Sequence, residues 1–300
     1  MKILITGGTT FVSKFAAEYF VSKGSDVTVI NRGSRPQVQE VTHIRCDRAA
    51  LGNRLKGKHF DLIFDVAAYT EADIALLLDS GVSFEDYVFI SSSAVYPETN
   101  HQPFSEDQAC GYNSLWRDYG MNKLKAEQYL HSHFENAYIL RPPYLYGIYE
   151  NIYREAFPFD CAMHAKPFYI PQNGEMKLQF FNVSDLCRFI EILIDKRPSE
   201  RIFNVGNKEA VSIKEWVELC YKAVGATAEF ICVSKDVSQR DYFCFPDYEY
   251  VLDVTRQNAL MPDTVPLEQG LKEEFEWYKD NLDGIYNRKP YLEFIDNNLR

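Results

Sequence analysis

Short apolar runs alternate with helix-like segments in the N-terminal part of the chain. The runs are bounded by turn residues and lie at Ile3–Ile5, Val27–Ile30, Leu62–Val66 and Tyr87–Ile90. Runs of this length are typical of strands that are buried on both faces, and strands that alternate with helices pair in parallel. The pattern therefore predicts an α/β fold in which helices cover both faces of a doubly wound parallel sheet.

Two helices can be placed by their end signals. Apolar residues recur at helical spacing from about Phe11 to Lys23, and Gly24 follows as a stop. A longer helix is predicted from Asn113 to His133, ahead of a strand that ends at Pro142 and Pro143. The order at the N-terminus is therefore strand, turn, helix, strand.

The pattern changes beyond Gly147, where short aromatic segments and several prolines replace the regular alternation. We predict a Rossmann-type dinucleotide-binding domain from residues 1–150 and about 177–205. A smaller, interwoven C-terminal lobe, formed by about 151–176 and 206–300, is predicted to bind the substrate. The sequence contains no repeat and no flexible linker between the two.

Composition and charge narrow the classes of partner. The formal net charge of −11 repels phosphate backbones, so a nucleic-acid partner is not expected. The 7 cysteines are scattered and never spaced as CxxC, which predicts reduced thiols and no metal site. No secretion signal is recognisable after Met1, and no apolar stretch reaches the roughly 20 residues that span a bilayer. These features predict a cytoplasmic protein with no membrane partner.

A glycine-containing turn joins the first strand to the first helix. At this position glycines let the backbone approach a pyrophosphate at the helix N-terminus. A strict GxxGxxG motif would place glycines at positions 7, 10 and 13, but Thr10 and Ser13 occupy the last two. The alternative is a tight turn that holds no nucleotide. The predicted cofactor-binding residues of this turn are Gly7, Thr9, Thr10, Phe11 and Val12.

The loop after the second strand bears on the choice between NAD and NADP. An acidic residue here usually binds a free ribose hydroxyl, whereas arginine accommodates a 2'-phosphate. The chain instead has Asn31 and Arg32, with Arg35 close by, which favours NADP. Asp47 follows a third strand segment, which lies between the runs Val27–Ile30 and Leu62–Val66. We predict that it binds the adenine amino group, although an aspartate that caps a turn is an equal alternative.

Tyr119 and Lys123 have the i, i+4 spacing that brings two side chains to one face of a helix. A free phenol titrates near pH 10, so a tyrosine acts as a base near neutrality only beside a cation that stabilises the phenolate. Lys123 can supply that charge. The pair alone is weak evidence, because such pairs are common on helix surfaces.

A hydroxyl cluster supports the catalytic interpretation. Ser91, Ser92 and Ser93 follow a predicted strand, and open α/β sheets bind ligands at the carboxyl ends of their strands. Ser92 can orient a reacting hydroxyl or carbonyl group. The alternative is a cluster that only caps a turn.

These motifs, in this order, resemble the extended short-chain dehydrogenase/reductase family, especially its nucleotide-sugar epimerases and dehydratases. The resemblance implies that Tyr119, Lys123 and Ser92 are catalytic, that Ala67 and Arg141 contact the cofactor together with Tyr119 and Lys123, and that Ser93 contacts the substrate. The segments that carry it are Gly7–Ser13, Ser91–Tyr96, Tyr119 with Lys123, Arg141–Gly147, Val183–Leu186 and Phe203–Gly206.

The implied reaction is transient oxidation of a nucleotide sugar to a keto intermediate, with Tyr119 as general acid and base and NADP or NAD as cofactor. Dehydratases of this group typically have Asp-Glu after the catalytic hydroxyl residue, whereas this chain has Ser93 and Ala94. The resemblance therefore implies an epimerase or reductase. Arg240 resembles the arginine that binds the nucleotide diphosphate, although pairing with Asp241 or Asp247 is an alternative.

Other interpretations stay open. The segments around Asn31 and Cys46 and the altered glycine turn also resemble an atypical branch that contains chloroplast stem-loop RNA-binding proteins. The acidic charge and the Tyr119/Lys123 pair argue against RNA binding. A nucleotide-sensing protein without turnover is a third alternative. The chain is a possible homodimer, and a monomer is equally compatible with its polar Tyr119 helix.

Overall fold

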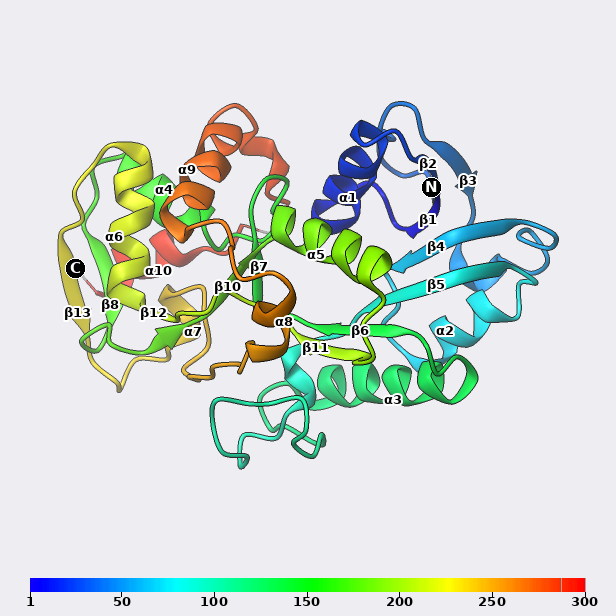
Figure 1. Cartoon of the computed structure of the whole chain (residues 1–300). Helices are drawn as coiled ribbons and strands as arrows, with labels where there is room; N and C mark the ends of the chain where they lie inside the picture. The colour runs from blue at the N-terminus through cyan, green and yellow to red at the C-terminus, as the bar shows by residue number, and fades with distance from the viewer. Residues whose placement is uncertain (287, 300) are drawn as a thin grey trace. The chain divides into compact units, whose positions relative to one another are not determined.

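The computed structural model describes residues 1–286 and 288–299 (Figure 1). The described chain forms two compact units, each assembled from several segments. The first unit contains residues 1–143, 183–206 and 252–263, and the second contains residues 144–182, 207–251, 264–286 and 288–299. The chain thus passes repeatedly from one unit to the other, so the units are interwoven.

The first unit is built on a parallel sheet whose order is β11-β6-β5-β4-β1-β2-β3. The order reverses at β1, so the crevice outside the carboxyl ends of β1 and β4 is the topological switch point. The predicted doubly wound, Rossmann-type α/β fold is confirmed. The strands are β1 (Lys2–Thr6), β2 (Asp26–Asn31), β3 (Thr42–Arg45), β4 (His59–Asp65), β5 (Ser83–Ile90), β6 (Tyr138–Arg141) and β11 (Ile202–Asn204).

Helices cover both faces of this sheet, as the buried strands require. Helices α1 and α5 pack together on one face, where the Tyr19 hydroxyl donates to Glu191 over 2.5 Å, and α2 packs on α3 across the other face (Figure 1). The helices are α1 (Phe11–Ser22), α2 (Glu71–Leu78), α3 (Arg117–His133), α5 (Val183–Lys196) and α8 (Thr255–Leu260), with short 3-10 turns η1 (Arg48–Ala50) and η2 (Ser93–Val95).

Helix α3 begins later than its sequence pattern predicts. The pattern placed its start at Asn113, but the first helical residue is Arg117. The Asn113 side-chain oxygen accepts from the backbone N–H of Leu115 and Trp116, at 3.0 and 3.3 Å. A side chain that binds nearby backbone groups competes with the helix for them, so Asn113 forms a turn ahead of α3.

The second unit surrounds an aromatic core, and its described strands form three small two-stranded sheets. The strands are β7 (Tyr144–Tyr146), β8 (Phe168–Pro171), β9 (Lys177–Leu178), β10 (Phe180–Asn182), β12 (Val211–Ser212) and β13 (Phe230–Val233). The helices are α4 (Ala156–Met163), α6 (Ile213–Val224), α7 (Gln239–Tyr242), α9 (Leu267–Tyr278) and α10 (Tyr291–Asn298), with the short turn η3 (Leu282–Gly284).

The units divide at positions other than the expected domain boundaries. Residues 144–150 and 177–182 belong to the second unit, and residues 252–263 belong to the first. The last segment joins the first unit because Leu252 bridges to Phe104 and because Gln257 exchanges hydrogen bonds with the backbone of Gly206. Among the described residues, no helix is both long and apolar enough to span a membrane.

Candidate active site

The turn after β1 has a backbone that only glycine adopts without strain. Gly7 and Gly8 have φ angles of +103° and +96°. A Cβ on Gly7 would lie 2.7 Å from Ser13 Oγ, and one on Gly8 would lie 2.7 Å from a Val29 methyl carbon. The two glycines therefore let the turn pack tightly between the start of α1 and strand β2, as expected for a phosphate-binding turn.

The N-terminus of α1 is open to an anion. Thr10 is the N-cap residue, its side chain makes no capping hydrogen bond, and the first turn carries the side chains of Phe11, Val12, Ser13 and Lys14. The partial positive charge at this helix end therefore has no acidic side chain of the first turn beside it.

A cavity of about 430 Å³ lies beside this turn, wholly within the first unit. Among its lining residues are the predicted cofactor residues Gly7, Thr9, Thr10, Asn31, Arg32, Asp47 and Ala67. Phe11 and Val12 are not among the lining residues, and Val12 is buried in the core. The structure thus brings most of the predicted dinucleotide residues to one cavity at the switch point of the sheet.

Asn31 has a positioning role at this cavity. Its side-chain nitrogen donates to the Gly7 carbonyl over 2.7 Å, and its side-chain oxygen accepts from the Gly33 N–H over 2.9 Å. These bonds tie the loop after β2 to the glycine turn. Exposed Arg32 and half-buried Arg35 follow on the same loop and both line the cavity.

Asp47 caps a turn, which is one of the two alternatives for this residue. Its carboxylate accepts from the Ala49 N–H over 2.9 Å and so caps the short turn η1. It also lines the cavity. The contact with an adenine amino group stays a prediction.

Sequence analysis missed a buried charge network at the floor of the cavity. Arg48 lines the cavity, and its guanidinium pairs with the fully buried Asp65 over 2.6 Å. Asp65 also accepts from the hydroxyls of Thr6 and Tyr87, each over 2.6 Å. Burial alone would raise the pKa of Asp65, but the Arg48 guanidinium and these hydrogen bonds hold it below its usual value. An arginine and an aspartate on different elements leave no spacing signal that could have revealed the pair.

A close approach of α3 to η2 assembles the catalytic candidates. A Cβ on Gly120 would lie 2.1 Å from the Ala94 carbonyl oxygen, so only glycine permits this contact. This approach brings Tyr119 near enough to Ser92 for the serine side chain to influence the pKa of the phenol. Gly120 was missed in the sequence because a glycine inside a helix carries no signal of what the helix packs against.

Burial and two neighbours set the acidity of Tyr119. Burial raises the pKa of the phenol, the Ser92 side chain opposes this rise, and the nearby Tyr69 hydroxyl adds to it. The rings of Tyr69 and Tyr119 lie 5.5 Å apart between centroids. The role of Lys123 in lowering the pKa of Tyr119 stays a prediction.

Lys123 is buried one helical turn after Tyr119 on α3. Its ammonium group donates to the carbonyl oxygens of Ala68 and Ile90, over 2.8 and 2.7 Å. Burial lowers the pKa of Lys123 to about 8, against the opposing charges of Asp65 and Glu127. The lysine thus ties α3 to the ends of β4 and β5, and it is poised to release its proton near neutral pH.

The structure places Arg141 away from the cavity. Its guanidinium forms a bidentate pair with Glu127, over 2.6 and 3.0 Å, and donates to the Tyr96 hydroxyl over 2.9 Å. Ser93 is also buried, and its N–H donates to the Pro142 carbonyl over 3.0 Å. Both residues therefore hold together the elements next to Ser92. Their predicted ligand contacts stay predictions.

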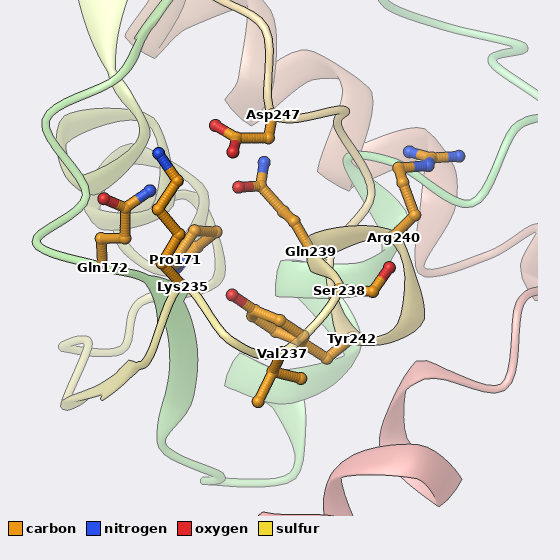
Figure 2. A pocket seen from close by; sticks show the side chains of 9 residues that line it. All are labelled: Pro171, Gln172, Lys235, Val237, Ser238, Gln239, Arg240, Tyr242 and Asp247. Atoms are coloured by element: carbon orange, nitrogen blue, oxygen red, sulfur yellow. The ribbon is translucent and has the colours of Figure 1, made fainter.

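Arg240 lies in the second unit, on α7. It donates to the carbonyl oxygen of Cys244 and lines a cavity of about 280 Å³. Figure 2 shows its guanidinium on the opposite side of Gln239 from Lys235 and Gln172. Arg240 thus binds a backbone carbonyl, and Asp247 lines the same cavity.

One group of metal-ligating side chains lies elsewhere on the first unit. His59 and Asp61 near the start of β4 and Glu85 on β5 place their ligand atoms within 4.8 Å of one another. Asp61 accepts from the Lys2 N–H, and Glu85 pairs with Arg197 over 3.4 Å. These residues belong to the opposite edge of the sheet from the glycine turn and Ser92, because parallel strands share one carboxyl edge.

Comparison with known proteins shows which families this chain resembles. A model of the NAD dependent epimerase/dehydratase family matches residues 74–206. The chloroplast stem-loop binding protein of 41 kDa b from Arabidopsis thaliana is 27% identical over 309 residues, which cover 95% of this chain and 78% of that protein. dTDP-D-glucose 4,6-dehydratase from Mus musculus is 21% identical, with coverage of 97% and 92%. The predicted resemblance, including that to the stem-loop-binding branch, is confirmed.

Solved structures of nucleotide-sugar enzymes share the fold. UDP-glucose 4-epimerase from Thermotoga maritima, solved with UDP-glucose, has a TM-score of 0.75 and 20% identity, over 94% of this chain and 100% of that one. UDP-glucuronic acid 4-epimerase from Bacillus cereus, solved with NAD, has a TM-score of 0.74 and 20% identity, over 95% and 98%.

Proposed function

We propose that this relative of the NAD-dependent epimerase/dehydratase family is an epimerase or reductase that acts on a nucleotide sugar, with Tyr119 as its general acid and base. The observation that carries the proposal is the close approach of Gly120 on α3 to Ala94 in η2, which brings Tyr119 near Ser92 beyond the carboxyl end of β5. The glycine turn follows β1 at the same edge of the sheet, which is where open α/β sheets bind their ligands.

The cavity beside the glycine turn fits a dinucleotide. Gly7 and Gly8 form a cradle that a Cβ would fill, and the N-terminus of α1 is open to a pyrophosphate. Thr9 and Thr10 line the same cavity, and each carries a hydroxyl group that can bind a phosphate oxygen. The Thr10 and Ser13 substitutions in the motif therefore leave a usable turn, because the closest approaches are made at the two glycines that are present.

The charges of the cavity favour NADP over NAD. Arg32, Ser34 and Arg35 lie on the loop after β2 and all line the cavity. Guanidinium and hydroxyl groups donate hydrogen bonds to a 2'-phosphate. Residues 31–35 include no aspartate or glutamate that could bind a free ribose hydroxyl.

The side chains at the end of β5 move the protons of the reaction. When bound, the nicotinamide ring exchanges a hydride with a sugar carbon. The Tyr119 oxygen takes the proton from the hydroxyl on that carbon, which leaves a keto sugar, and it returns the proton in the reverse step. Ser92 orients the reacting oxygen. The Lys123 ammonium, when released from one of its two carbonyl partners, is free to bind a ribose hydroxyl.

The residues after Ser92 favour an epimerase or reductase over a dehydratase. Elimination of water needs an acid beside the catalytic hydroxyl residue. The chain has Ser93 and Ala94 at these positions, and both are buried. Neither can protonate a leaving hydroxyl group as a carboxylic acid does.

The second unit offers a cationic surface for a nucleoside diphosphate. Arg240 lines a further cavity of about 510 Å³, in which the charged lining residues are Arg240, Arg288 and Lys289, beside Tyr153 and Tyr291. Arg288 also pairs with Asp160. Three cations in one cavity suit an anionic ligand, and they stand out on a chain whose net charge is −11.

Calorimetric titration with NADP and NAD tests the proposal. We expect micromolar NADP binding, weakened about tenfold by Arg32→Ala through the loss of a charge-assisted phosphate contact. NAD binding should be unchanged by this variant, and Arg54→Ala, which removes another exposed arginine of the first unit, serves as the matched control. Binding of neither dinucleotide would refute the proposal, and tighter binding of NAD would refute only the NADP preference.

A second candidate function is RNA binding or nucleotide sensing without turnover. The 27% identity to a protein named for stem-loop binding favours it, while the charge of −11 opposes RNA binding. Gel-shift titration with stem-loop RNA at about 0.15 M salt separates the candidates. We expect no complex, whereas a salt-sensitive complex would favour RNA binding. Tight dinucleotide binding without turnover of any nucleotide sugar would favour sensing.

A further inference from the structure

Tyr69 combines an exposed aromatic ring with a backbone that is unusually well fixed. It follows β4 in the first unit, and 40% of its surface is exposed. A tyrosine ring on a fixed backbone offers a large contact area at a low cost in conformational entropy, so it is well suited to bind a ligand. The surroundings of Tyr69 indicate which kind of ligand this surface meets.

Every backbone N–H from residue 66 to residue 69 has a side-chain acceptor, so this segment is fixed even though it lies outside any helix or strand. Thr6 Oγ1 accepts the first two, over 3.1 and 3.0 Å, and an Asp65 carboxylate oxygen accepts the third over 3.1 Å. The fourth, from Tyr69, is accepted by Asp73 Oδ2 over 2.9 Å.

The segment is also tied to the helices on either side of it. Thr70 and Asp73 form a capping box at the start of α2, directly after Tyr69. The carbonyl of Ala68 accepts from the Lys123 ammonium over 2.8 Å, which connects the segment to α3. The Tyr69 backbone is therefore held in register with the helix that carries Tyr119.

The ring of Tyr69 rests against the ring of Tyr119. The centroids lie 5.5 Å apart and the planes are inclined by 44°. Tyr69 keeps 40% of its surface exposed in spite of this contact. Tyr69 thus presents an open aromatic surface immediately beside the proposed acid and base.

We propose that Tyr69 is a substrate-contacting residue whose ring stacks on the apolar C–H face of the hexose and so presents the sugar hydroxyl to Tyr119. The inference rests on the proposed function and deepens it, because it names the side chain that recognises the sugar part of the nucleotide sugar. A hexose ring carries a patch of C–H groups that pack on an aromatic face, while its hydroxyl groups stay free to bind polar residues.

The test compares UDP-glucose with UDP, because only the former carries the sugar. NADP-loaded wild type, Tyr69→Ala and Tyr69→Phe are titrated by calorimetry with each ligand. We expect Tyr69→Ala to weaken UDP-glucose binding about tenfold, as loss of an aromatic stacking contact predicts, with UDP binding unchanged. Tyr69→Phe keeps the ring and should bind UDP-glucose within threefold of wild type.

Tyr129→Ala is the matched control. Tyr129 is another partly exposed tyrosine on α3, stacked on His133 with centroids 4.1 Å apart, but it lies ten residues after Tyr119 and so about 15 Å further along the helix. It should leave both affinities unchanged. Thermal unfolding of each variant checks that it folds.

The outcomes separate this inference from the proposed function. Equal UDP-glucose affinity in wild type and Tyr69→Ala overturns the role of Tyr69, and so does an equal loss for UDP and UDP-glucose, which indicates a structural defect. Wild type that binds NADP but not UDP-glucose also contradicts it, while the dinucleotide part of the proposed function stands. Wild type that binds no NADP contradicts both.

Discussion

At the scale of single residues, two side chains on α3 carry the proposed chemistry in different electrostatic surroundings. Burial raises the pKa of Tyr119, and the Ser92 side chain opposes this rise. Lys123 has a pKa lowered to about 8 because it is buried among backbone carbonyls. Burial disfavours the charged form of each, so the pKa of Tyr119 is moved away from neutral pH and the pKa of Lys123 is moved toward it.

Removing the phenolic oxygen tests the role of Tyr119. We expect Tyr119→Phe to lower kcat by about 100-fold or more, because it deletes the general acid and base. Dinucleotide affinity should stay within threefold of wild type, since the cavity beside the glycine turn is unchanged. Steady-state turnover of a nucleotide sugar, with calorimetry for the cofactor, measures both. A variant that keeps the wild-type rate would exclude Tyr119 as the proton carrier.

The lowered pKa of Lys123 predicts a stability that rises with pH. Between about pH 8 and 10.5 the folded lysine has lost its proton while the unfolded lysine still holds it, so the unfolded state binds more protons. Stability then increases with pH, by up to about 1.4 kcal/mol per pH unit from this group. Below pH 8 both states are protonated and the contribution is constant.

Urea unfolding of wild type and Lys123→Met at pH 7, 8, 9 and 10 isolates this contribution. The difference in unfolding free energy should stay constant from pH 7 to 8 and then change in favour of wild type. A constant difference over the whole range would show that Lys123 keeps its ordinary pKa.

At the scale of elements, the site depends on how closely α3 approaches η2. Gly120 faces the Ala94 carbonyl with no room for a methyl group. The helix therefore sits deeper on the sheet edge than it could with any other residue, and the Tyr119 hydroxyl reaches Ser92 as a result.

Gly120→Ala should push α3 away from η2. We expect a loss of about 1 to 3 kcal/mol in unfolding free energy, as for overpacked interiors, together with a lower kcat through separation of Tyr119 from Ser92. Gly111→Ala is a suitable control, because its Cβ would meet only Pro97 at an ordinary distance of 3.4 Å. Urea unfolding and turnover of both variants measure the effect. Equal behaviour of the two variants would contradict the close approach.

At the scale of the whole molecule, the two units differ in how they balance buried charge. The first unit pairs Asp65 with Arg48 and Glu127 with Arg141. In the second unit Arg154 pairs with both Glu150 and Glu155, and its charge also acts on buried Glu274. One guanidinium among three buried carboxyl groups leaves an excess of acid, and burial raises the pKa of each of them.

This excess of buried carboxyl groups predicts that the second unit is more stable in mild acid than at neutral pH. The pKa of Glu150 is raised to about 7, so between pH 4.5 and 7 the folded state holds a proton that the unfolded state has released. Stability from this group is full below pH 4.5 and is lost as the pH rises to 7. Glu274→Gln removes one acid and should flatten the dependence.

Thermal unfolding from pH 5 to 8 checks this prediction. Wild type should lose melting temperature across the range, whereas Glu274→Gln should lose less. A steeper loss in the variant than in wild type would contradict the shared excess of acid.

The local pattern of the sequence determined the strands and helices of the first unit. Apolar runs of strand length, separated by a helix with a glycine stop, specify a parallel sheet without reference to the rest of the chain, since burial on both faces requires continuous apolar residues. The glycine turn and the Tyr119/Lys123 pair could also be predicted from the sequence, because a positive φ angle and the spacing of residues on a helix depend only on residues close in the chain. The half-exposed edge strand β3 carries no such run and was harder to place.

Only the tertiary structure decided which side chains from different elements are in contact. Asp65 meets Arg48 and Tyr69 meets Tyr119 because the order of the strands brings distant segments to one sheet edge. The pairing of Arg141 on β6 with Glu127 on α3 is a further contact of this kind. Sequence spacing determines which side chains share a face of one element, whereas contact between elements depends on packing across the whole sheet, which no local pattern records.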